Sequence, residues 1–173
     1  MFQLFAYLLL YTGCRRGEAL ALTWDDIDFD NNLIYINKQL QFQSNKPVIE
    51  NFTKSKAGIR TVPMLENLRA ALLPFKKNSG YVFSVNRNLL TSKQFRDGWK
   101  SLGFSSTPHQ FRHAYATTLY NAKIDAKTAQ SLLGHSSVSI TLDVYTHISK
   151  NVANSAKEQL NNYISQSKIS QKS

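Results

Sequence analysis

Residues 12–24 read Thr-Gly-Cys-Arg-Arg-Gly-Glu-Ala-Leu-Ala-Leu-Thr-Trp and separate two predicted helices. The apolar run Met1–Tyr11 predicts a buried first helix, and Gly13 ends it, since glycine after an apolar run is the usual terminator. A short second helix is predicted from about Arg15 to Leu22, where apolar side chains recur at helical spacing. An arginine-rich turn therefore joins the two helices.

The segments that follow predict a small sheet and further helices. Ile27–Gln43 indicates a hairpin that turns at residues 30–32, and Ile59–Val62 indicates a third strand. Helical patterns start at Leu65, after the capping Thr91, at Thr107-Pro108 and after the capping Asp125; the third runs to about Asn121 and the last to Gly134. The predicted fold class is α+β: a mainly helical domain with a small antiparallel three-stranded sheet at one edge.

The last part of the chain carries two different patterns. Val138–Val144 alternates apolar residues at every second position, and this periodicity alone predicts a strand. Ser149–Ser173 is polar, and we expect one amphipathic helix there, followed by a loose tail. The apolar positions that repeat at helical spacing in it are Val152, Ala156, Leu160 and Ile164.

Charge and composition indicate a polyanionic partner. Lys and Arg number 21 and Asp and Glu 11, so the formal net charge is +10 over 173 residues, a length that suits one domain. Such an excess favours nucleic acid ahead of a membrane surface. The opening apolar run is about half the ~20 residues that a membrane span needs. The single cysteine, Cys14, favours a reducing compartment.

Two clusters of polar side chains lie at predicted helix starts. Arg15 and Glu18 are three residues apart, so the carboxylate can hold the guanidinium towards a phosphate; a surface salt bridge is the plainer alternative. His109 and Arg112 share one face at the start of a helix, where free N–H groups attract an anion. A solvated polar face is the alternative here, and His113 lies one position further round the helix.

Two further clusters are weaker when taken alone. His135 follows a helix-ending glycine, and Tyr145 comes ten residues later; a helix end and a core aromatic explain them equally well. Lys54-Ser55-Lys56 is a basic turn that a hairpin can carry into a cleft, although most such turns only face solvent.

In this order the clusters resemble the catalytic domain of the tyrosine recombinases, the phage integrase family. The resemblance covers nearly the whole chain and rests on Thr12–Trp24, Thr107–His113, and Leu132–His135 with Tyr145. In that family the segment corresponding to Val138–Val144 is helical and carries the nucleophile. The resemblance therefore overrides the strand that the alternation predicts.

The resemblance implies a catalytic set of six residues: Arg15, Lys54, His109, Arg112, His135 and Tyr145. Tyr145 would attack a DNA phosphodiester to form a 3′-phosphotyrosine and release a 5′-hydroxyl. Arg15 and Arg112 would neutralise the charge that builds up in the transition state. Because the phosphotyrosine stores the bond energy, the family needs no cofactor, metal or ATP.

The proton transfers fall to the other members of the set. By the same resemblance, His109 serves as acid or base near the tyrosine hydroxyl, and His135 adds a hydrogen bond to the phosphate. Lys54 protonates the leaving 5′-oxygen, as the family's hairpin lysine does, with Lys56 as the alternative. Arg16 lies beside Arg15 at a position that varies in the family, so Arg15 is preferred.

The resemblance also sets expectations for location, domains and partners. It implies a cytoplasmic, nucleoid-associated protein that a bacterium or a phage encodes. Residues 1–173 correspond to a single C-terminal catalytic domain, with a core at 1–148 and a helix and tail at 149–173. Family members carry core-binding and often arm-binding domains ahead of it, which these residues lack. The expected partners are double-stranded DNA, a homotetramer on recombining sites (with an isolated fragment monomeric) and an excisionase-type accessory protein. The C-terminal stripe can pack on a neighbouring subunit or on its own domain.

The predicted function is site-specific DNA recombination or integration for a mobile genetic element. A type IB topoisomerase-like nicking-closing enzyme would use nearly the same residues but would relax supercoils without a specific site. A non-catalytic DNA-binding module predicts a broken catalytic set, whereas all six residues are present. The sequence shows no carboxylate cluster of the kind that a metal-dependent nuclease needs.

Overall fold

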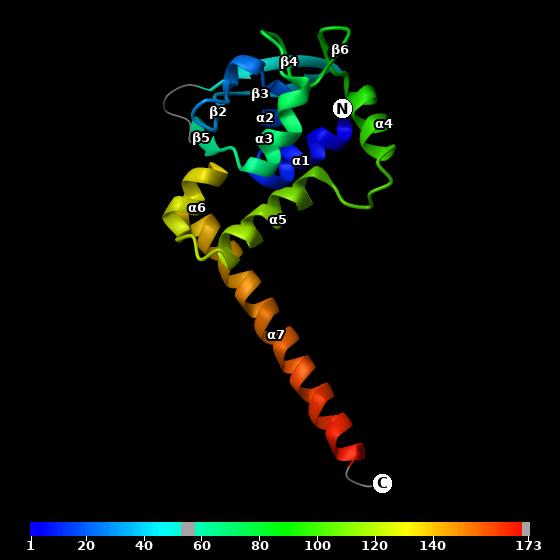
Figure 1. Ribbon diagram of the computed structural model, residues 1–173, viewed down its shortest axis with the longest axis vertical. Helices are drawn as coiled ribbons and strands as arrows, with labels where there is room; N and C mark the ends of the chain where they lie inside the picture. The colour runs from blue at the N-terminus through cyan, green and yellow to red at the C-terminus, as the bar shows by residue number, and fades with distance from the viewer. Residues whose placement is uncertain (53–57, 171–173) are drawn as a thin grey trace.

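The computed structural model describes residues 1–52 and 58–170, with side chains as far as residue 164 (Figure 1). Its helices are α1 (Phe2–Thr12), α2 (Arg16–Ala21), α3 (Glu66–Leu72), α4 (Ser92–Lys100), α5 (Pro108–Asn121), α6 (Ala126–Leu133) and α7 (Val138–Ser170), with short 3-10 turns at Trp24–Asp26 and Leu73–Phe75. Its strands are β1 (Ile27–Asp28), β2 (Leu33–Ile36), β3 (Lys38–Gln43), β4 (Lys46–Asn51), β5 (Arg60–Pro63), β6 (Ser84–Val85) and β7 (Asn88–Leu89). Figure 1 shows α1 to α4 and the strands gathered at one end, while α7 extends away.

The two helices predicted around the arginine-rich turn are confirmed. Gly13 ends α1 in the left-handed conformation, with φ of 62°, and its N–H donates to the carbonyl of Leu9 at 3.0 Å. A left-handed residue in this position is what most often favours glycine after a helix. The backbone N–H of Arg15 then donates to the Glu18 carboxylate at 2.8 Å, which caps the start of α2.

The predicted three-stranded sheet is confirmed, but its hairpin is shorter than expected. The strands pair antiparallel in the order β1-β2-β5, with Ile34 opposite both Ile27 and Val62. The hairpin expected over Ile27–Gln43 ends at β2, because β3 pairs instead with β4 in a separate two-stranded sheet. Ser44 and Asn45 make its turn with φ of 48° and 64°, the positive values of a type I′ hairpin turn.

Val138–Val144 form the start of α7, so the helix that the family resemblance implied is confirmed and the strand that the alternation alone indicated is wrong. Thr141 is fully buried, and Val144 and Tyr145 pack on the small cluster between α5 and α6. Positions three and four apart share one face of a helix, so burial of this face outweighs the β propensity of the segment. The helix is continuous past residue 149, so the expected C-terminal helix is its second half.

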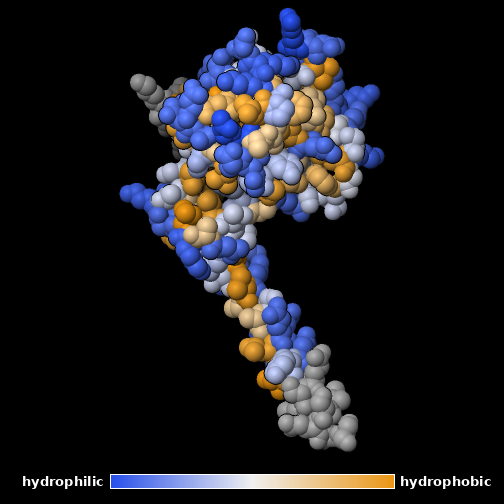
Figure 2. All heavy atoms as spheres, in the orientation of Figure 1, coloured by the Kyte–Doolittle hydropathy of each residue, from blue (hydrophilic) through white to orange (hydrophobic). Residues whose placement is uncertain are grey.

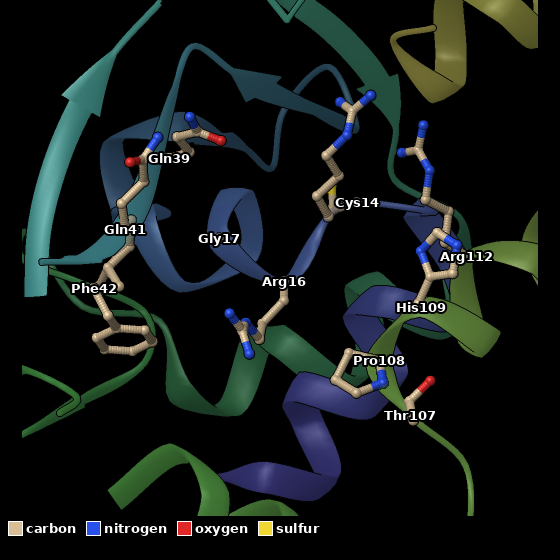
Figure 3. A pocket seen from close by; sticks show the side chains of 12 residues that line it. Cys14, Arg16, Gly17, Gln39, Gln41, Phe42, Thr107, Pro108, His109 and Arg112 are labelled. Carbon is tan, nitrogen blue, oxygen red and sulfur yellow. The ribbon is translucent and has the colours of Figure 1, made fainter. Parts of the chain in front are cut away.

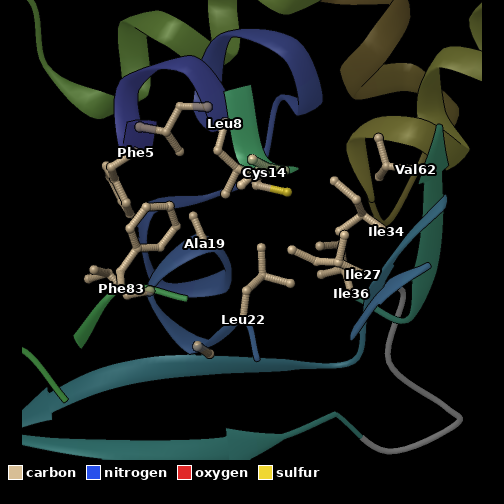
Figure 4. Close-up of a cluster of buried hydrophobic side chains, with 14 of the residues drawn as sticks. Phe5, Leu8, Cys14, Ala19, Leu22, Ile27, Ile34, Ile36, Val62 and Phe83 are labelled. Carbon is tan, nitrogen blue, oxygen red and sulfur yellow. The ribbon is translucent and has the colours of Figure 1, made fainter. Parts of the chain in front are cut away.

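The main hydrophobic cluster joins α1 and α2 to the three-stranded sheet. Figure 4 shows Leu8, Ala19, Ile34 and Val62 from these elements around one interior, and none of the four is measurably exposed. The smaller cluster, between α5, α6 and the first turns of α7, includes Leu133. Arg15, His109, Arg112 and His135 lie where the elements of these two clusters meet.

The second half of α7 leaves its apolar stripe uncovered. Val152, Leu160 and Ile164 are 56%, 61% and 50% exposed, and Figure 2 shows apolar side chains along the projecting helix. None of the described helices is both long enough and apolar enough to cross a bilayer.

Candidate active site

Four of the six side chains expected from the sequence line one cavity. Arg15, His109, Arg112 and His135 surround a space of about 390 Å³. They come from the start of α2, from the first turns of α5 and from the residue after Gly134, the glycine that ends α6. The fold therefore brings together residues that are up to 120 positions apart in the sequence (135 − 15).

A second cavity, of about 650 Å³, adjoins the first and shares Arg15, His109 and Arg112 with it. In Figure 3, Gln39 and Phe42 of β3 lie on one side, across from His109 and Arg112. The described residues that line the two cavities include no acidic side chain. Such a cationic lining favours an anionic ligand.

Arg112 is fixed by backbone carbonyls rather than by a carboxylate. Its guanidinium donates to the carbonyl of Gly13 at 2.7 Å and to that of Leu133 at 2.6 Å. Burial, and then the nearby charge of Arg15, lower the pKa of Arg112 to about 10. The side chain is therefore still a cation at neutral pH.

Arg15 is held as the sequence suggested, but its partner is not at the surface. Arg15 Nη1 donates to Glu18 Oε1 at 2.8 Å; the Glu18 side chain is fully buried and that of Arg15 is 44% exposed. The alternative of an ordinary surface salt bridge is therefore wrong. Glu18 also accepts two hydrogen bonds from Arg60 of β5, at 3.1 and 2.8 Å. Sequence reasoning missed Arg60, because an arginine on a strand beside a basic turn looks like a solvated residue.

His135 is neutral at physiological pH. Burial, and then the charges of Arg112 and Arg15, lower its pKa to about 4. Its Nδ1 lies 2.9 Å from the hydroxyl of Thr141, one turn into α7. A hydroxyl that donates to Nδ1 leaves the proton on Nε2, where it can be donated to a ligand. Sequence reasoning missed Thr141, because a threonine six positions from His135 gives no local sign of this contact.

His109 is in contact with a second histidine, His113. The Nε2 atoms of His109 and His113 are 3.1 Å apart, and the rings meet edge to face. Burial, and then the proximity of His109 and Arg112, lower the pKa of His113. The sequence analysis placed His113 one position beyond Arg112 on the helix, and the structure shows that it contacts His109 directly.

Tyr145 lies outside both cavities in this structure. Its hydroxyl donates to the carbonyl of Ile124, in the turn between α5 and α6, at 3.1 Å. Its ring packs edge-on against Tyr120, with centroids 5.3 Å apart. Burial, and then the charge of Asp125, raise its pKa. The structure therefore separates Tyr145 from the two arginines that the sequence grouped with it.

Lys54 and Lys56 lie outside the described residues. Phe52 and Gly58, on either side of that segment, both line the smaller cavity. Within the described ranges, no group of three or more His, Cys, Asp or Glu side chains is arranged to hold a metal ion.

The family model for "Phage integrase family" matches residues 2–152 of the chain. The chain belongs to the phage integrase family. A tyrosine recombinase XerC-like protein of Caldanaerobacter subterraneus is 32% identical over 90% of this chain and 48% of its own length. The transposase of transposon Tn916 from Enterococcus faecalis is 29% identical over 89% of the chain and 44% of its own length.

Solved structures agree with this family membership. The Tn1549 transposon integrase in complex with circular intermediate DNA superimposes with a TM-score of 0.69 at 28% identity, over 90% of this chain and 58% of that one. The catalytic domain of bacteriophage HP1 integrase, at 23% identity, shares the fold with a TM-score of 0.57 over 84% of this chain and 73% of its own. The chain spans about half the length of the recombinase and transposase relatives named above (48% and 44%).

Proposed function

We propose that this chain is the catalytic domain of a site-specific DNA recombinase or integrase of a mobile genetic element. The observation that carries the proposal is the cavity where Arg15, Arg112, His109 and His135 converge without a described acidic residue. Relatives that serve transposons, the Tn916 transposase and the Tn1549 integrase, support the mobile-element role.

The arginine pair is suited to a phosphodiester. Both guanidinium groups are anchored by hydrogen bonds on one side, to Glu18 for Arg15 and to backbone carbonyls for Arg112. Donors that are already fixed need no reorganisation when charge builds up on the phosphate. Neutral His135 would add a hydrogen bond from Nε2, and His109 would move the proton of the attacking hydroxyl.

Tyr145 is proposed as the nucleophile and Lys54 as the general acid. The attack requires the Tyr145 hydroxyl to leave the carbonyl of Ile124 and approach the phosphate between the arginines. The raised pKa of Tyr145 fits a hydroxyl that is protonated at rest and is activated only at the cavity. No cofactor, metal or ATP enters this reaction, because the phosphotyrosine conserves the energy of the phosphodiester.

The uncovered stripe on α7 supports assembly on DNA. Val152, Leu160 and Ile164 are half exposed or more, so their own domain does not cover them. We propose that the stripe packs on a neighbouring subunit of a tetramer and that further DNA-binding domains precede residue 1 in the whole protein. An excisionase-type accessory protein and a cytoplasmic location belong to the same proposal.

The test is covalent capture of DNA. A duplex from the presumed attachment site carries a nick close to the scissile phosphate, so that the fragment with the 5′-hydroxyl diffuses away after cleavage. The chain, and the longer protein that we propose contains it, should form an adduct with the DNA that survives SDS. Tyr145→Phe should abolish the adduct, whereas Tyr120→Phe should retain it. Tyr120 is a matched control because its ring packs directly on Tyr145.

Three outcomes separate the alternatives. If the longer protein binds its site and forms no adduct, the chain is a binding module. Relaxation of supercoiled plasmids that lack the site, with no recombinant product from plasmids that carry two sites, favours the topoisomerase-like alternative. Recombinant products from two sites support the recombinase.

A further inference from the structure

The C-terminal end of α6 is held by guanidinium groups from three different elements. The pairs are Arg60 Nε with the carbonyl of Leu132 at 2.8 Å, Arg112 Nη2 with Leu133 at 2.6 Å, and Arg15 Nη2 with Gly134 at 3.0 Å. The last carbonyls of a helix have no donor within the helix, so cations bind well there. Two of the three arginines belong to the proposed catalytic set, and Arg60 does not.

Arg60 differs from Arg15 and Arg112 in the partners of its guanidinium nitrogens. Its side chain is 5% exposed, and it is not among the described residues that line either cavity. Besides Leu132, its nitrogens bind both oxygens of Glu18 and, at 3.3 Å, the carbonyl of Gly58. Every nitrogen of this guanidinium therefore has a protein acceptor, so Arg60 can act on a ligand only through other residues.

Glu18 connects Arg60 to Arg15. Each Glu18 oxygen accepts one bond from Arg15 and one from Arg60, all between 2.8 and 3.1 Å. Burial alone would raise the pKa of Glu18, but the hydrogen bonds and charge of Arg60 outweigh it and keep the pKa below its usual value. Arg60 therefore keeps a buried carboxylate ionised in the one orientation that anchors Arg15.

Gly134 shows how closely Arg60 is fitted to the end of α6. A Cβ atom at Gly134 would lie 2.8 Å from Arg60 Nη1 and 3.1 Å from its Cδ and Cζ. The next residue is His135, so the position of Arg60 also bears on the direction in which the chain presents that imidazole.

We propose that Arg60 is a positioning residue for DNA cleavage. It sets the guanidinium of Arg15 through Glu18, and the imidazole of His135 through the end of α6, without contacting DNA. The inference rests on the proposed function, because Arg15 and His135 matter only if this cavity holds the scissile phosphate.

The experiment separates DNA binding from chemistry. Single-turnover adduct formation on the nicked duplex is followed against DNA concentration for the longer protein, as wild type, Arg60→Lys and Arg60→Met. The maximal rate should fall by up to about 100-fold, since displacements of about 1 Å at reacting groups have effects of that order. The DNA concentration that gives half the maximal rate should change by less than about threefold, because no lost group contacts DNA. Arg60→Lys should not rescue the rate, since an ammonium cannot form the two-pronged contact with Glu18.

Two matched pairs exclude a merely structural effect. Val62→Ala opens a cavity on the same strand, at a fully buried position in the main hydrophobic cluster, and should lower stability while leaving the maximal rate unchanged. Gly134→Ala should reproduce the Arg60 defect by displacing the guanidinium. Gly103→Ala, at φ of 72° beside 67° for Gly134 and with no atom within 4 Å of the added Cβ, should not.

The outcomes are distinct. Folded Arg60 variants with a wild-type maximal rate, or with a loss only in the half-saturating DNA concentration, overturn the proposal. If neither Arg60 variant folds, Gly134→Ala decides, and a wild-type rate in it overturns the proposal. An adduct that persists in Tyr145→Phe, or none from the wild type, overturns the proposed function instead.

Discussion

His135 shows how a side chain acquires its protonation state from its surroundings. Burial and the neighbouring arginines lower its pKa to about 4, against about 6.5 for a free histidine. In an NMR titration we expect the His135 ring signals to show no titration midpoint between pH 5 and 8, and to have the pattern of the Nε2-protonated tautomer. A titration midpoint between pH 6 and 7 would contradict this account of the site.

Glu18 is predicted to make stability depend on pH. Its pKa is lower in the folded chain than in the unfolded one, so its contribution is complete above the unfolded pKa of about 4.3 and is lost as the pH falls through the folded pKa. Glu18→Gln should lower the unfolding free energy by about 3 kcal/mol at pH 7, because it leaves the buried Arg60 without a counter-ion. Urea unfolding at pH 7 and pH 3 should show this difference shrinking at pH 3. A difference that is the same at both pH values would count against the ion pair.

At the scale of single residues, the sequence predicted those residues whose partners are close in the sequence. Arg15 with Glu18, and His109 with Arg112, lie three positions apart, and helical geometry alone groups each pair. Arg60 is 42 positions from Glu18, and nothing in its neighbourhood signals that the fold will bury it there. The contact of Tyr145 with the carbonyl of Ile124 is likewise invisible in the sequence, because it depends on how α7 packs.

Among the elements, α2 and β3 are in unusually close contact at Gly17. A Cβ atom there would lie 2.5 Å from the carbonyl oxygen of Leu40 in β3. Replacing glycine by alanine inside a helix ordinarily stabilises it by up to about 1 kcal/mol. Here we expect Gly17→Ala to destabilise the domain instead, because a backbone atom of the neighbouring strand must move. Urea unfolding measures the sign, with Asn67→Ala on the exposed face of α3 as the control for helix propensity alone. A stabilised Gly17→Ala variant would mean that β3 gives way at little cost.

The sequence predicted well those elements whose ends carry strong stop signals. Gly13 and Gly134 end helices, and both take the left-handed conformation that glycine tolerates. The β3–β4 hairpin was missed because Ser44-Asn45 is a weaker turn signal than Asn-Gly. At the start of α7 the alternation of apolar residues alone indicated a strand, and only the family resemblance predicted the helix, although the buried positions follow the helical period.

At the scale of the whole molecule, we expect the stability of the domain not to depend on the projecting half of α7. Removing residues 153–173 takes away exposed side chains such as Leu160, at 61% exposure, and none of the side chains described there, up to residue 164, belongs to either hydrophobic cluster. The unfolding free energy should stay within about 0.5 kcal/mol of the full chain, as for surface changes in general. A loss above about 2 kcal/mol would show that the helix packs on its own domain, against the proposed contact with a neighbouring subunit.

The most direct test of the central claim is to identify the residue that DNA modifies. Protease digestion and mass spectrometry of the SDS-resistant adduct should find the nucleotide on the peptide that contains Tyr145, linked through the tyrosine oxygen. Attachment to any other of the eight tyrosines, or to a serine or cysteine, would contradict the account, because the cavity of Arg15 and Arg112 would then serve a different nucleophile.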